Sequence, residues 1–344
     1  MSKTLKVACI GAGYFSQFHY DAWQRIPDTE VVSICNRHLE PAQKIASQYG
    51  ITRVYTDIDT MLDDGDIDLL DIITPPTTHK AAIFAAAHHG VNAVCQKPFA
   101  NDYAEAKALT EIAESAGITV CIHENFRFMP WFRHTHQLLQ QEALGTILNA
   151  RFALRPGDGQ GSNAYLDRQP YFQTMERFLV HETAVHFVDC FRYLFGEPCT
   201  LYASLRRCNP VIKGEDSATI LFDYDNGLAV TIDGNRLLDH PSSNTRRTFG
   251  EMWIEGTAGT LRLDGEGRLF LRKFSDNQEF ELDYQWQDQG FGGDCVYQLN
   301  QHVANHFLSG TPLENSARQY LRNIEIEEAI YRSDSEGRRL SISS

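Results

Sequence analysis

The first third of the chain alternates between short apolar runs and longer segments that carry one apolar face. Each apolar run leads into a turn and then into an amphipathic stretch that ends near a glycine. These strand–helix units cover residues 5–26, 30–50, 68–90 and 91–117, and a further strand is expected within 118–128. Strands that alternate with helices at this spacing predict a parallel sheet with helices on both faces.

After about residue 127 the pattern becomes that of a β-rich domain. Residues 131–145 predict a helix that ends at a glycine, and a strand is expected to follow directly. Residues 217–235 alternate between apolar and polar positions around Asp225-Asn226-Gly227. Such a turn sequence tolerates positive φ angles and joins hairpin strands. A largely antiparallel sheet is therefore expected in this part of the chain.

The remaining pattern completes a two-domain organisation. Glycine-punctuated strands continue over residues 251–274, and a last helix is expected near 313–331. We predict an α/β protein with a parallel-sheet domain over 1–126. A second domain, with a largely antiparallel sheet, is predicted over 127–344. This division leaves open whether the C-terminal helix packs back on the first domain.

Composition and charge exclude several classes of protein. The chain has 344 residues, a natural length for two domains. A formal net charge of −14 argues against a nucleic-acid-binding protein, which needs a basic face against phosphate. No apolar run reaches membrane-spanning length, and the N-terminus lacks the pattern of a signal peptide. The eight cysteines show no paired spacing, so we expect reduced thiols and a cytoplasmic protein.

The segment VNAVCQKPFA, residues 91–100, predicts a buried strand that stops at a lysine. Ligands of parallel sheets bind at the carboxyl ends of the strands, and Lys97 lies at such an end. Pro98 restricts the backbone directly after it. The ammonium group is therefore expected to be held in place rather than free in solvent.

A glycine-containing turn follows the first strand and opens the first helix. Gly11 allows a tight turn, and Gly13 lets the backbone approach a pyrophosphate at the helix N-terminus. Ser16 stands where the third glycine of the dinucleotide fingerprint is expected, and it is small enough for close helix–strand packing. We predict that a pyrophosphate binds over this turn, which also contains Tyr14 and Phe15.

The second strand ends in Cys35-Asn36-Arg37, where an acidic residue commonly binds the adenosine ribose. Asn36 can still bind ribose hydroxyls, and it lacks the carboxylate that would repel a 2′-phosphate. Arg37 can pair with such a phosphate, stack on adenine or point to solvent. The sequence therefore predicts NAD or NADP without a preference.

The segment RFLVHETAVHFVDCFRYLFGEP, residues 177–198, predicts a mostly buried helix from about Glu182 to Leu194. Glu182, His186 and Asp189 recur at i, i+4 and i+7 and are expected to share a face. His181 lies five residues before His186 and falls on another face, so the spacing of zinc proteases is absent and no metal is expected. A carboxylate–histidine pair on a buried helix needs a partner or a function.

These motifs together resemble the Gfo/Idh/MocA family of dehydrogenases. The resemblance extends over nearly the whole chain and rests on GAGYFS, ITPPTTH, CQKPFA, ENFRFMP, HETAVHFVDCFRYLFG and YRSDSEGRR. Family motifs read Glu-Lys-Pro and Asp-x-Gly-x-His, whereas this chain has Gln96-Lys97-Pro98 and Glu182-x-Ala184-x-His186. The resemblance implies that residues 1–126 form a Rossmann dinucleotide-binding domain. It also implies that residues 127–344 form a substrate-binding and oligomerisation domain on a large, mostly antiparallel open sheet, with a homodimer or homotetramer through that sheet.

The resemblance also implies roles for individual residues. Lys97 corresponds to the lysine that positions the reacting hydroxyl, His186 to the catalytic acid and base, and Glu182 to the carboxylate beside it. The implied cofactor-binding positions are Gly11, Gly13, Tyr14, Phe15, Asn36, Arg37, Thr74, Pro75, His79, Gln96, Lys97 and Asn125. The implied reaction is hydride transfer from a sugar or polyol hydroxyl to a nicotinamide, in which the hydroxyl also loses a proton.

The substrate is expected to be a small polar molecule. Segment 154–172 lies between the first strand of the second domain and the helix that contains His186. Its polar side chains suit the binding of hydroxyl groups, and they are Arg155, Asp158, Asn163, Tyr165, Arg168 and Gln169. A flexible surface loop would have a similar composition. The predicted substrate-binding residues are Lys97, Asn125, Arg155, Tyr165, Arg168, His181, Glu182 and His186. An aldose or a polyol-like sugar fits this set. Two alternatives remain: a reductase of a cyclic imine or enone, and a non-catalytic protein that senses dinucleotides.

Overall fold

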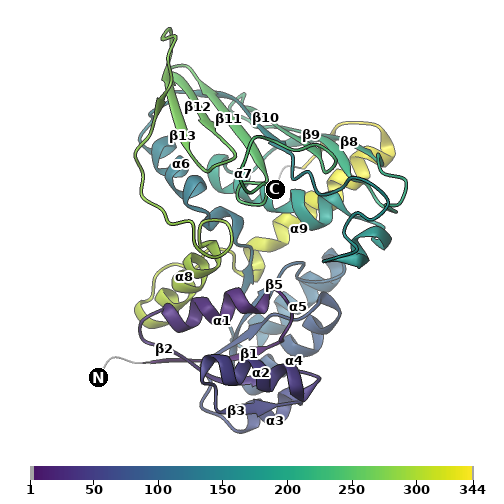
Figure 1. Ribbon diagram of the computed structural model, residues 1–344, viewed down its shortest axis with the longest axis vertical. Helices are drawn as coiled ribbons and strands as arrows, with labels where there is room; N and C mark the ends of the chain where they lie inside the picture. Colours follow the sequence, from purple (N-terminus) through teal and green to yellow (C-terminus); the bar gives the residue numbers. More distant parts are fainter. Residues whose placement is uncertain (1–3, 343–344) are drawn as a thin grey trace. The chain divides into compact units, whose positions relative to one another are not determined.

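The structure is a computed structural model that describes residues 4–342, and it divides into two compact units (Figure 1). The first unit runs up to Asn125 and takes in Asp294–Ile324 as well. The second unit comprises Phe126–Gly293 and the chain from Glu325 onward. Each unit is built on a sheet of its own.

The first unit contains a six-stranded parallel sheet in the order β3-β2-β1-β4-β5-β6. Its strands are β1 (Leu5–Ile10), β2 (Thr29–Cys35), β3 (Arg53–Tyr55), β4 (Leu69–Ile72), β5 (Asn92–Gln96) and β6 (Val120–His123). The strand order reverses between β1 and β4. In parallel sheets, ligands bind at the carboxyl ends of the strands that flank such a reversal.

Helices of the first unit begin and end where local chemistry favours it. They are α1 (Ser16–Arg25), α2 (Leu39–Tyr49), α3 (Ile58–Asp63), α4 (His79–His89), α5 (Tyr103–Ser115) and α8 (Cys295–Ser309). The Asp102 side chain caps α5 by accepting a hydrogen bond from the Glu105 amide. Gly90 ends α4 with a φ of 66°, which costs glycine little. Helix α8 packs against α1 (Figure 1).

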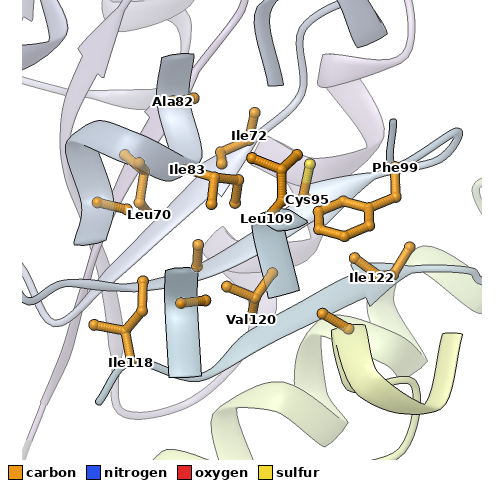
Figure 2. Packing of buried hydrophobic residues seen from close by; sticks show 14 of the residues in the cluster. Leu70, Ile72, Ala82, Ile83, Cys95, Phe99, Leu109, Ile118, Val120 and Ile122 are labelled. Carbon is orange, nitrogen blue, oxygen red and sulfur yellow. The ribbon is translucent and has the colours of Figure 1, made fainter. Parts of the chain in front are cut away.

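The core of this unit fills the space between the sheet and its helices. Figure 2 shows Leu70 and Ile72 of β4 packed with Ile83 of α4, Leu109 of α5 and Val120 of β6. The same cluster includes four residues of α9 (Ala317–Glu336), namely Ala317, Tyr320, Leu321 and Ile324. The first half of the C-terminal helix therefore completes the core of the first unit.

The second unit contains a nine-stranded sheet in the order β14-β13-β12-β11-β7-β10-β9-β8-β15. Its strands are β7 (Ile147–Leu154), β8 (Thr200–Arg206), β9 (Ser217–Asp223), β10 (Ala229–Asn235), β11 (Gly250–Gly256), β12 (Gly259–Leu263), β13 (Leu269–Lys273), β14 (Phe280–Glu281) and β15 (Leu340–Ser341). Among the described strands of this second sheet, only the pairing of β10 with β7 is parallel. Its helical segments are η2 (Phe126–Phe128), α6 (Pro130–Gln140), η3 (Pro170–Thr174), η4 (Leu179–Ala184) and α7 (Val185–Phe195).

The predicted fold class, a Rossmann sheet plus a mostly antiparallel sheet, is confirmed. The structure differs from the sequence predictions at three places. The helix predicted from Glu182 is divided, because η4 is a π-helix and α7 begins only at Val185. The last helix begins at Ala317 rather than near 313, because the Ser316 hydroxyl lies 3.3 Å from the Gln319 amide and caps it there. Residues 294–324 lie in the first unit, whereas the sequence division assigned them to the second domain.

Among residues 4–342, no helix combines the length and the apolar character that crossing a membrane requires.

Candidate functional site

The turn after β1 lies against the backbone that leaves β4. Gly11 has a φ of 117°, and a Cβ atom there would come within 2.9 Å of the Ile73 carbonyl oxygen, so only glycine fits. The Gly11 carbonyl oxygen accepts a hydrogen bond of 2.9 Å from the buried Tyr20 hydroxyl. At Gly13, in contrast, no atom lies within 4 Å of an added Cβ. Contacts at Gly11 thus fix the turn, and the backbone at Gly13 remains open to a ligand. This arrangement fits the binding of a pyrophosphate.

Ser16 stabilises this turn from inside the helix. Its side chain is buried, and its hydroxyl donates to the Gly13 carbonyl oxygen at 2.7 Å. Tyr14 is 61% exposed, whereas Phe15 is half-buried with its ring centre 5.2 Å from that of Phe18. Of the two aromatic residues predicted to contact the cofactor, one projects into solvent beside the turn and the other packs on α1.

Asn36 and Arg37 follow the end of β2, next to β1. The Asn36 side-chain amide donates to the His38 carbonyl oxygen at 2.8 Å, and the exposed Arg37 guanidinium lies 3.3 Å from the His38 ring. Both side chains therefore contact their own loop.

His79 connects the loops that follow β4 and β5. Its side chain is buried, with Nε2 at 2.8 Å from the Thr74 carbonyl oxygen and Nδ1 at 3.3 Å from the Phe99 carbonyl oxygen. Burial lowers the pKa of His79, although these carbonyl groups partly oppose the effect. The half-buried Thr74 and the exposed Pro75 lie at the carboxyl end of β4, so His79 supports these two predicted cofactor positions through the backbone.

Replacing His79 with asparagine should make stability less dependent on pH. The unfolded chain protonates this histidine near its ordinary value of 6.5, whereas the folded chain resists protonation because its pKa is lowered. Stability is therefore lost as pH falls below about 6.5, by at most about 1.4 kcal/mol per pH unit. Urea unfolding at about pH 7 and about pH 5 should show a smaller difference in His79→Asn than in the wild type. The same substitution at the exposed His88, on the same helix, is the control, and an equal change there would contradict the assignment.

The end of β5 places Gln96 and Lys97 beside two buried histidines. Gln96 pairs in register with His123 of β6, and its amide nitrogen lies 3.1 Å from His123 Nδ1 and 2.8 Å from His19 Nε2. His19 Nδ1 in turn lies 2.8 Å from Asp71 Oδ2. Lys97 is half-buried and directly follows this anchored residue.

The end of β6 is also held by buried polar contacts. Asn125 is 3% exposed and follows Glu124, which is fully buried. The Tyr320 hydroxyl lies 3.1 Å from Glu124 Oε2, and the Asn315 side chain donates to the Glu124 carbonyl oxygen at 2.9 Å. The predicted cofactor positions after β1, β2, β4, β5 and β6 thus lie at the carboxyl ends of neighbouring strands in one sheet.

In the second unit, a buried carboxylate organises the π-helix that contains Glu182. Glu215 Oε1 accepts hydrogen bonds from the Phe178 and Val180 amides at 3.1 and 2.9 Å, and from the Tyr331 hydroxyl at 2.7 Å. π-Helical turns are rare and occur frequently at functional sites. The wider turn carries the half-buried Glu182.

His186 and Asp189 of α7 both contact the short helix η2. The His186 ring is 6% exposed and stacks on Phe126 with ring centres 3.9 Å apart and planes 10° apart. Asp189 is fully buried and accepts two hydrogen bonds from the Arg127 guanidinium, at 2.7 and 2.6 Å. Contacts with consecutive residues of η2 place the two side chains on one face of α7, as the helical spacing predicted. The Arg127 pair fixes the rotation of the helix that carries His186.

His181 has a different environment from His186. Its Nδ1 atom lies 2.6 Å from Glu327 Oε1 on α9, and its backbone amide lies 3.3 Å from the Tyr331 hydroxyl. The His181 side chain keeps about a fifth of its surface exposed, at 22%. A carboxylate at Nδ1 orients the ring.

The loop before the π-helix is anchored by an ion pair that sequence reasoning missed. The buried Arg236 donates to both oxygens of Asp158, at 3.2 and 2.9 Å, and to the Thr183 hydroxyl at 2.7 Å. Burial opposes the charge of Arg236, but Asp158 outweighs it and the pKa of the guanidinium is raised. Tyr165 lies 3.1 Å from Asp158, and Arg168 lies 3.5 Å from it. Asp158, Tyr165 and Arg168 are therefore gathered beside the residue that follows Glu182.

Arg155 is not part of this group. Its guanidinium pairs with the Asp233 side chain on β10. The neighbouring Gly234 faces Leu179 of the π-helix, and side chains alternate along a strand, so Asp233 lies on the opposite face of the sheet. Of the other polar residues predicted in this loop, Asn163 is exposed, and Gln169 lies 3.1 Å from the Tyr171 hydroxyl.

Sequence reasoning missed two buried charged residues, and only one of them had a local signal. Asp71 interrupts the apolar strand β4, whereas Arg236 follows β10, a strand that alternates between apolar and polar residues. Both are buried and both are paired. A buried charge needs a partner, so Asp71 was a detectable candidate, although its partner was not.

Two family models match this chain. A model described as an oxidoreductase family with an NAD-binding Rossmann fold matches residues 5–124. The GFO/IDH/MocA C-terminal domain model matches residues 132–262.

Curated relatives are similar to this chain over almost their entire length. The D-apiose dehydrogenase of Rhizobium rhizogenes is 33% identical over 345 residues, which cover 98% of this chain and 97% of that protein. The D-apiose dehydrogenase of Paraburkholderia graminis is 32% identical over 349 residues, covering 99% of this chain and 91% of that protein.

Solved structures share the fold. A structure of an oxidoreductase from Agrobacterium radiobacter in complex with NAD+, L-tartaric acid and magnesium is 31% identical with a TM-score of 0.89, and the match covers 99% of each chain. A levoglucosan dehydrogenase in complex with NADH and levoglucosan has a TM-score of 0.83 at 20% identity, and the match covers 99% of this chain and 100% of that chain.

Proposed function

Because the chain belongs to the GFO/IDH/MocA family of NAD-binding oxidoreductases, we propose that it oxidises a hydroxyl group of D-apiose or a similar small sugar. The predicted resemblance, the oxidoreductase class and the nicotinamide cofactor are confirmed by the matches. The substrate and the roles of individual residues are proposals. Their main support is the similarity to two D-apiose dehydrogenases along nearly the whole chain.

The chain's own residues fit the binding of the cofactor. The open backbone at Gly13 would face the pyrophosphate, Asn36 would bind the adenosine ribose, and Thr74 and Pro75 would lie beside the middle of the cofactor. Bound NAD+ supplies the acceptor for the hydride that leaves the sugar carbon.

We assign the handling of the hydroxyl group to two side chains. The Lys97 ammonium would hold the sugar oxygen and stabilise the negative charge that grows there. The His186 imidazole would accept the hydroxyl proton, with Glu182 close to it in the chain as a carboxylate that can stabilise the imidazolium. The anchored strand end before Lys97 and the stacked ring of His186 support these roles, because a catalytic group must be held still.

Substrate recognition is assigned to the polar loop of the second unit together with residues at the strand ends of the first. Asn125, Tyr165, Arg168 and His181 remain candidates for binding sugar hydroxyls. Arg155 is left out, because its guanidinium is paired with Asp233 on the other face of the sheet. D-Apiose is a branched five-carbon sugar with several hydroxyl groups, and donors and acceptors of this kind suit it.

The proposed function is tested by a screen of sugar-dependent NAD+ and NADP+ reduction. D-Apiose, levoglucosan and myo-inositol would be compared with D-ribose, a five-carbon sugar without the branch. We expect the highest kcat/KM for D-apiose. A higher value for an unbranched sugar would contradict the substrate assignment, and no reduction with any sugar would contradict the reaction.

The substitution Asn36→Asp should shift cofactor preference toward NAD+. A carboxylate at this position accepts hydrogen bonds from both ribose hydroxyls and repels a 2′-phosphate. The shift is measured as the ratio of kcat/KM for NAD+ to kcat/KM for NADP+. The same change at Asn101, an exposed residue that is not among the predicted cofactor-binding positions, is the control. An unchanged ratio in Asn36→Asp would show that other residues decide the preference.

A further inference from the structure

The strand end that carries Lys97 is anchored by a chain of buried polar groups. From one end to the other, its members are Asp71, His19, Gln96, His123 and Asn300. All except the half-buried Gln96 are at most 1% exposed. They come from β4, α1, β5, β6 and α8, so five separate elements of the first unit meet at this chain.

The hydrogens in the first half of the chain can be placed from the chemistry of the groups. Asp71 Oδ2 accepts a hydrogen bond of 2.7 Å from the Trp23 indole, which can only donate. A carboxylate that lies 2.8 Å from His19 Nδ1 then accepts from that nitrogen as well. His19 therefore carries its hydrogen on Nδ1, and its Nε2 is available to accept.

The Gln96 amide continues the same pattern. Its nitrogen carries two hydrogens and lies within hydrogen-bond distance of His19 Nε2 and His123 Nδ1, at 2.8 and 3.1 Å. One hydrogen goes to each imidazole. His123 then carries its own hydrogen on Nε2 and donates to Asn300 Oδ1 at 3.1 Å. Burial, with the nearby His19, lowers the pKa of His123 well below its ordinary value, which agrees with a neutral ring.

A carboxylate at position 96 would not fit this arrangement. Glutamate has no hydrogen to give, so both imidazoles would have to donate toward it. His19 would then donate from both nitrogens, to Asp71 and to residue 96, and would carry a positive charge. His123 would have to move its hydrogen from Nε2 to Nδ1. Nε2 could then no longer donate to Asn300 Oδ1, so this hydrogen bond would be lost unless the Asn300 side chain turned. The two histidines are therefore matched to glutamine.

We propose that His19 and His123, held by Asp71 and Asn300, are positioning residues that require an amide at position 96 and fix the strand end from which Lys97 projects. This inference rests on the role proposed for Lys97 only where it concerns catalysis. The hydrogen-bond pattern itself is a property of the free protein, and it can be measured without a substrate.

The first test is NMR of the ¹⁵N-labelled imidazoles in the full-length protein near neutral pH. We expect the hydrogen of His19 on Nδ1 and that of His123 on Nε2, with signals assigned by the loss of one set in each histidine variant. In Gln96→Glu we expect His19 to become doubly protonated. The opposite tautomers in the wild type, or an unchanged His19 in Gln96→Glu, would overturn the proposal.

The second test separates positioning from folding by kinetics with NAD+ and the best sugar of the screen. Gln96→Glu and His123→Leu should lower kcat on the order of 10- to 100-fold, because small displacements of a reacting group have effects of this size. The Kd for NADH should change much less. His123→Asn keeps an acceptor near the position of Nδ1 and should lose far less activity than His123→Leu. The exposed His88→Asn serves as the control.

The outcomes distinguish this inference from the proposed function. Equal losses in His123→Asn and His123→Leu, with matching losses of thermal stability, would show a structural role only and overturn the positioning role. If none of the sugars allows the wild type to reduce NAD+ but the NMR pattern is as expected, the proposed function fails and the hydrogen-bond assignment stands. If the wild type oxidises a sugar but its histidines show the opposite tautomers, the proposed function stands and the hydrogen-bond assignment fails.

Discussion

Replacing Lys97 with alanine is expected to lower kcat by about 100- to 1000-fold, the usual effect of removing one group that stabilises developing charge. The Kd for NADH should change little, because the ammonium is proposed to act on the sugar oxygen, whose charge grows only in the transition state. Steady-state kinetics with D-apiose and a fluorescence titration with NADH measure the two quantities separately.

Lys80 offers a matched control for Lys97. It lies on α4 with 60% of its side chain exposed and pairs with Glu105 at 3.6 Å. Lys80→Ala should leave kcat unchanged. If Lys97→Ala weakened NADH binding as strongly as it lowered kcat, Lys97 would be a cofactor-binding residue and not a group that acts on the substrate.

Replacing His186 with alanine is expected to lower kcat by a factor comparable to that of Lys97→Ala, because general acid–base catalysis contributes about 100- to 10,000-fold. The pH dependence of kcat/KM near neutrality should also become flatter, because the group proposed to accept the proton is removed. Activity measured from mildly acidic to mildly alkaline pH tests both points. The double variant with Lys97→Ala should lose less than the product of the two single losses, because both groups serve one proton transfer.

His136 is a suitable control for His186, because it is also a stacked histidine of the second unit. Its ring lies 4.3 Å from that of Tyr193, with planes 19° apart. His136→Ala removes a similar stacking contact without touching the proposed catalytic group. A His186→Ala protein with near-normal kcat and an unchanged pH profile would move the proton acceptor elsewhere, and His181 with its Glu327 partner would be the next candidate.

The elements that local pattern predicted are those with a regular period and clear end signals. The βαβ units of the first unit and the hairpin around Gly227 follow directly from alternation, helical spacing and turn residues. The helix α8 was not predicted, and neither was its place in the first unit. Its location depends on packing against α1, more than 260 residues earlier in the chain, and no local pattern encodes such a contact.

In the candidate site too, the features with a local sequence signature could be predicted, whereas those that depend on distant residues could not. The positions of Gly11 and Lys97 could be predicted, because glycine turns and strand ends have local signatures. The π-helix at Glu182 could not, since the wider turn depends on Glu215 accepting from two amides of that segment. The anchoring of Gln96 could not be predicted either, because His19 is 77 residues away and its orientation depends on Asp71.

Two alternative functions raised by the sequence are now less favoured. A non-catalytic sensor is opposed by the confirmed membership in a family of oxidoreductases and by the similarity to named dehydrogenases. A reductase of a cyclic imine or enone is less favoured, because the similar proteins named D-apiose dehydrogenase and levoglucosan dehydrogenase are dehydrogenases of sugars. The proposal of sugar oxidation therefore has the stronger basis.

The most direct test of the account is a single-turnover experiment in which the enzyme with NAD+ is mixed with D-apiose. NADH absorbance and proton release, followed with a pH indicator, are recorded together. Oxidation of a hydroxyl group releases one hydride and one proton, so we predict equal amounts of NADH and protons, and a much slower formation of both in the variant that lacks both Lys97 and His186. Formation of NADH at the wild-type rate in that double variant, or no NADH from the wild type, would contradict the account.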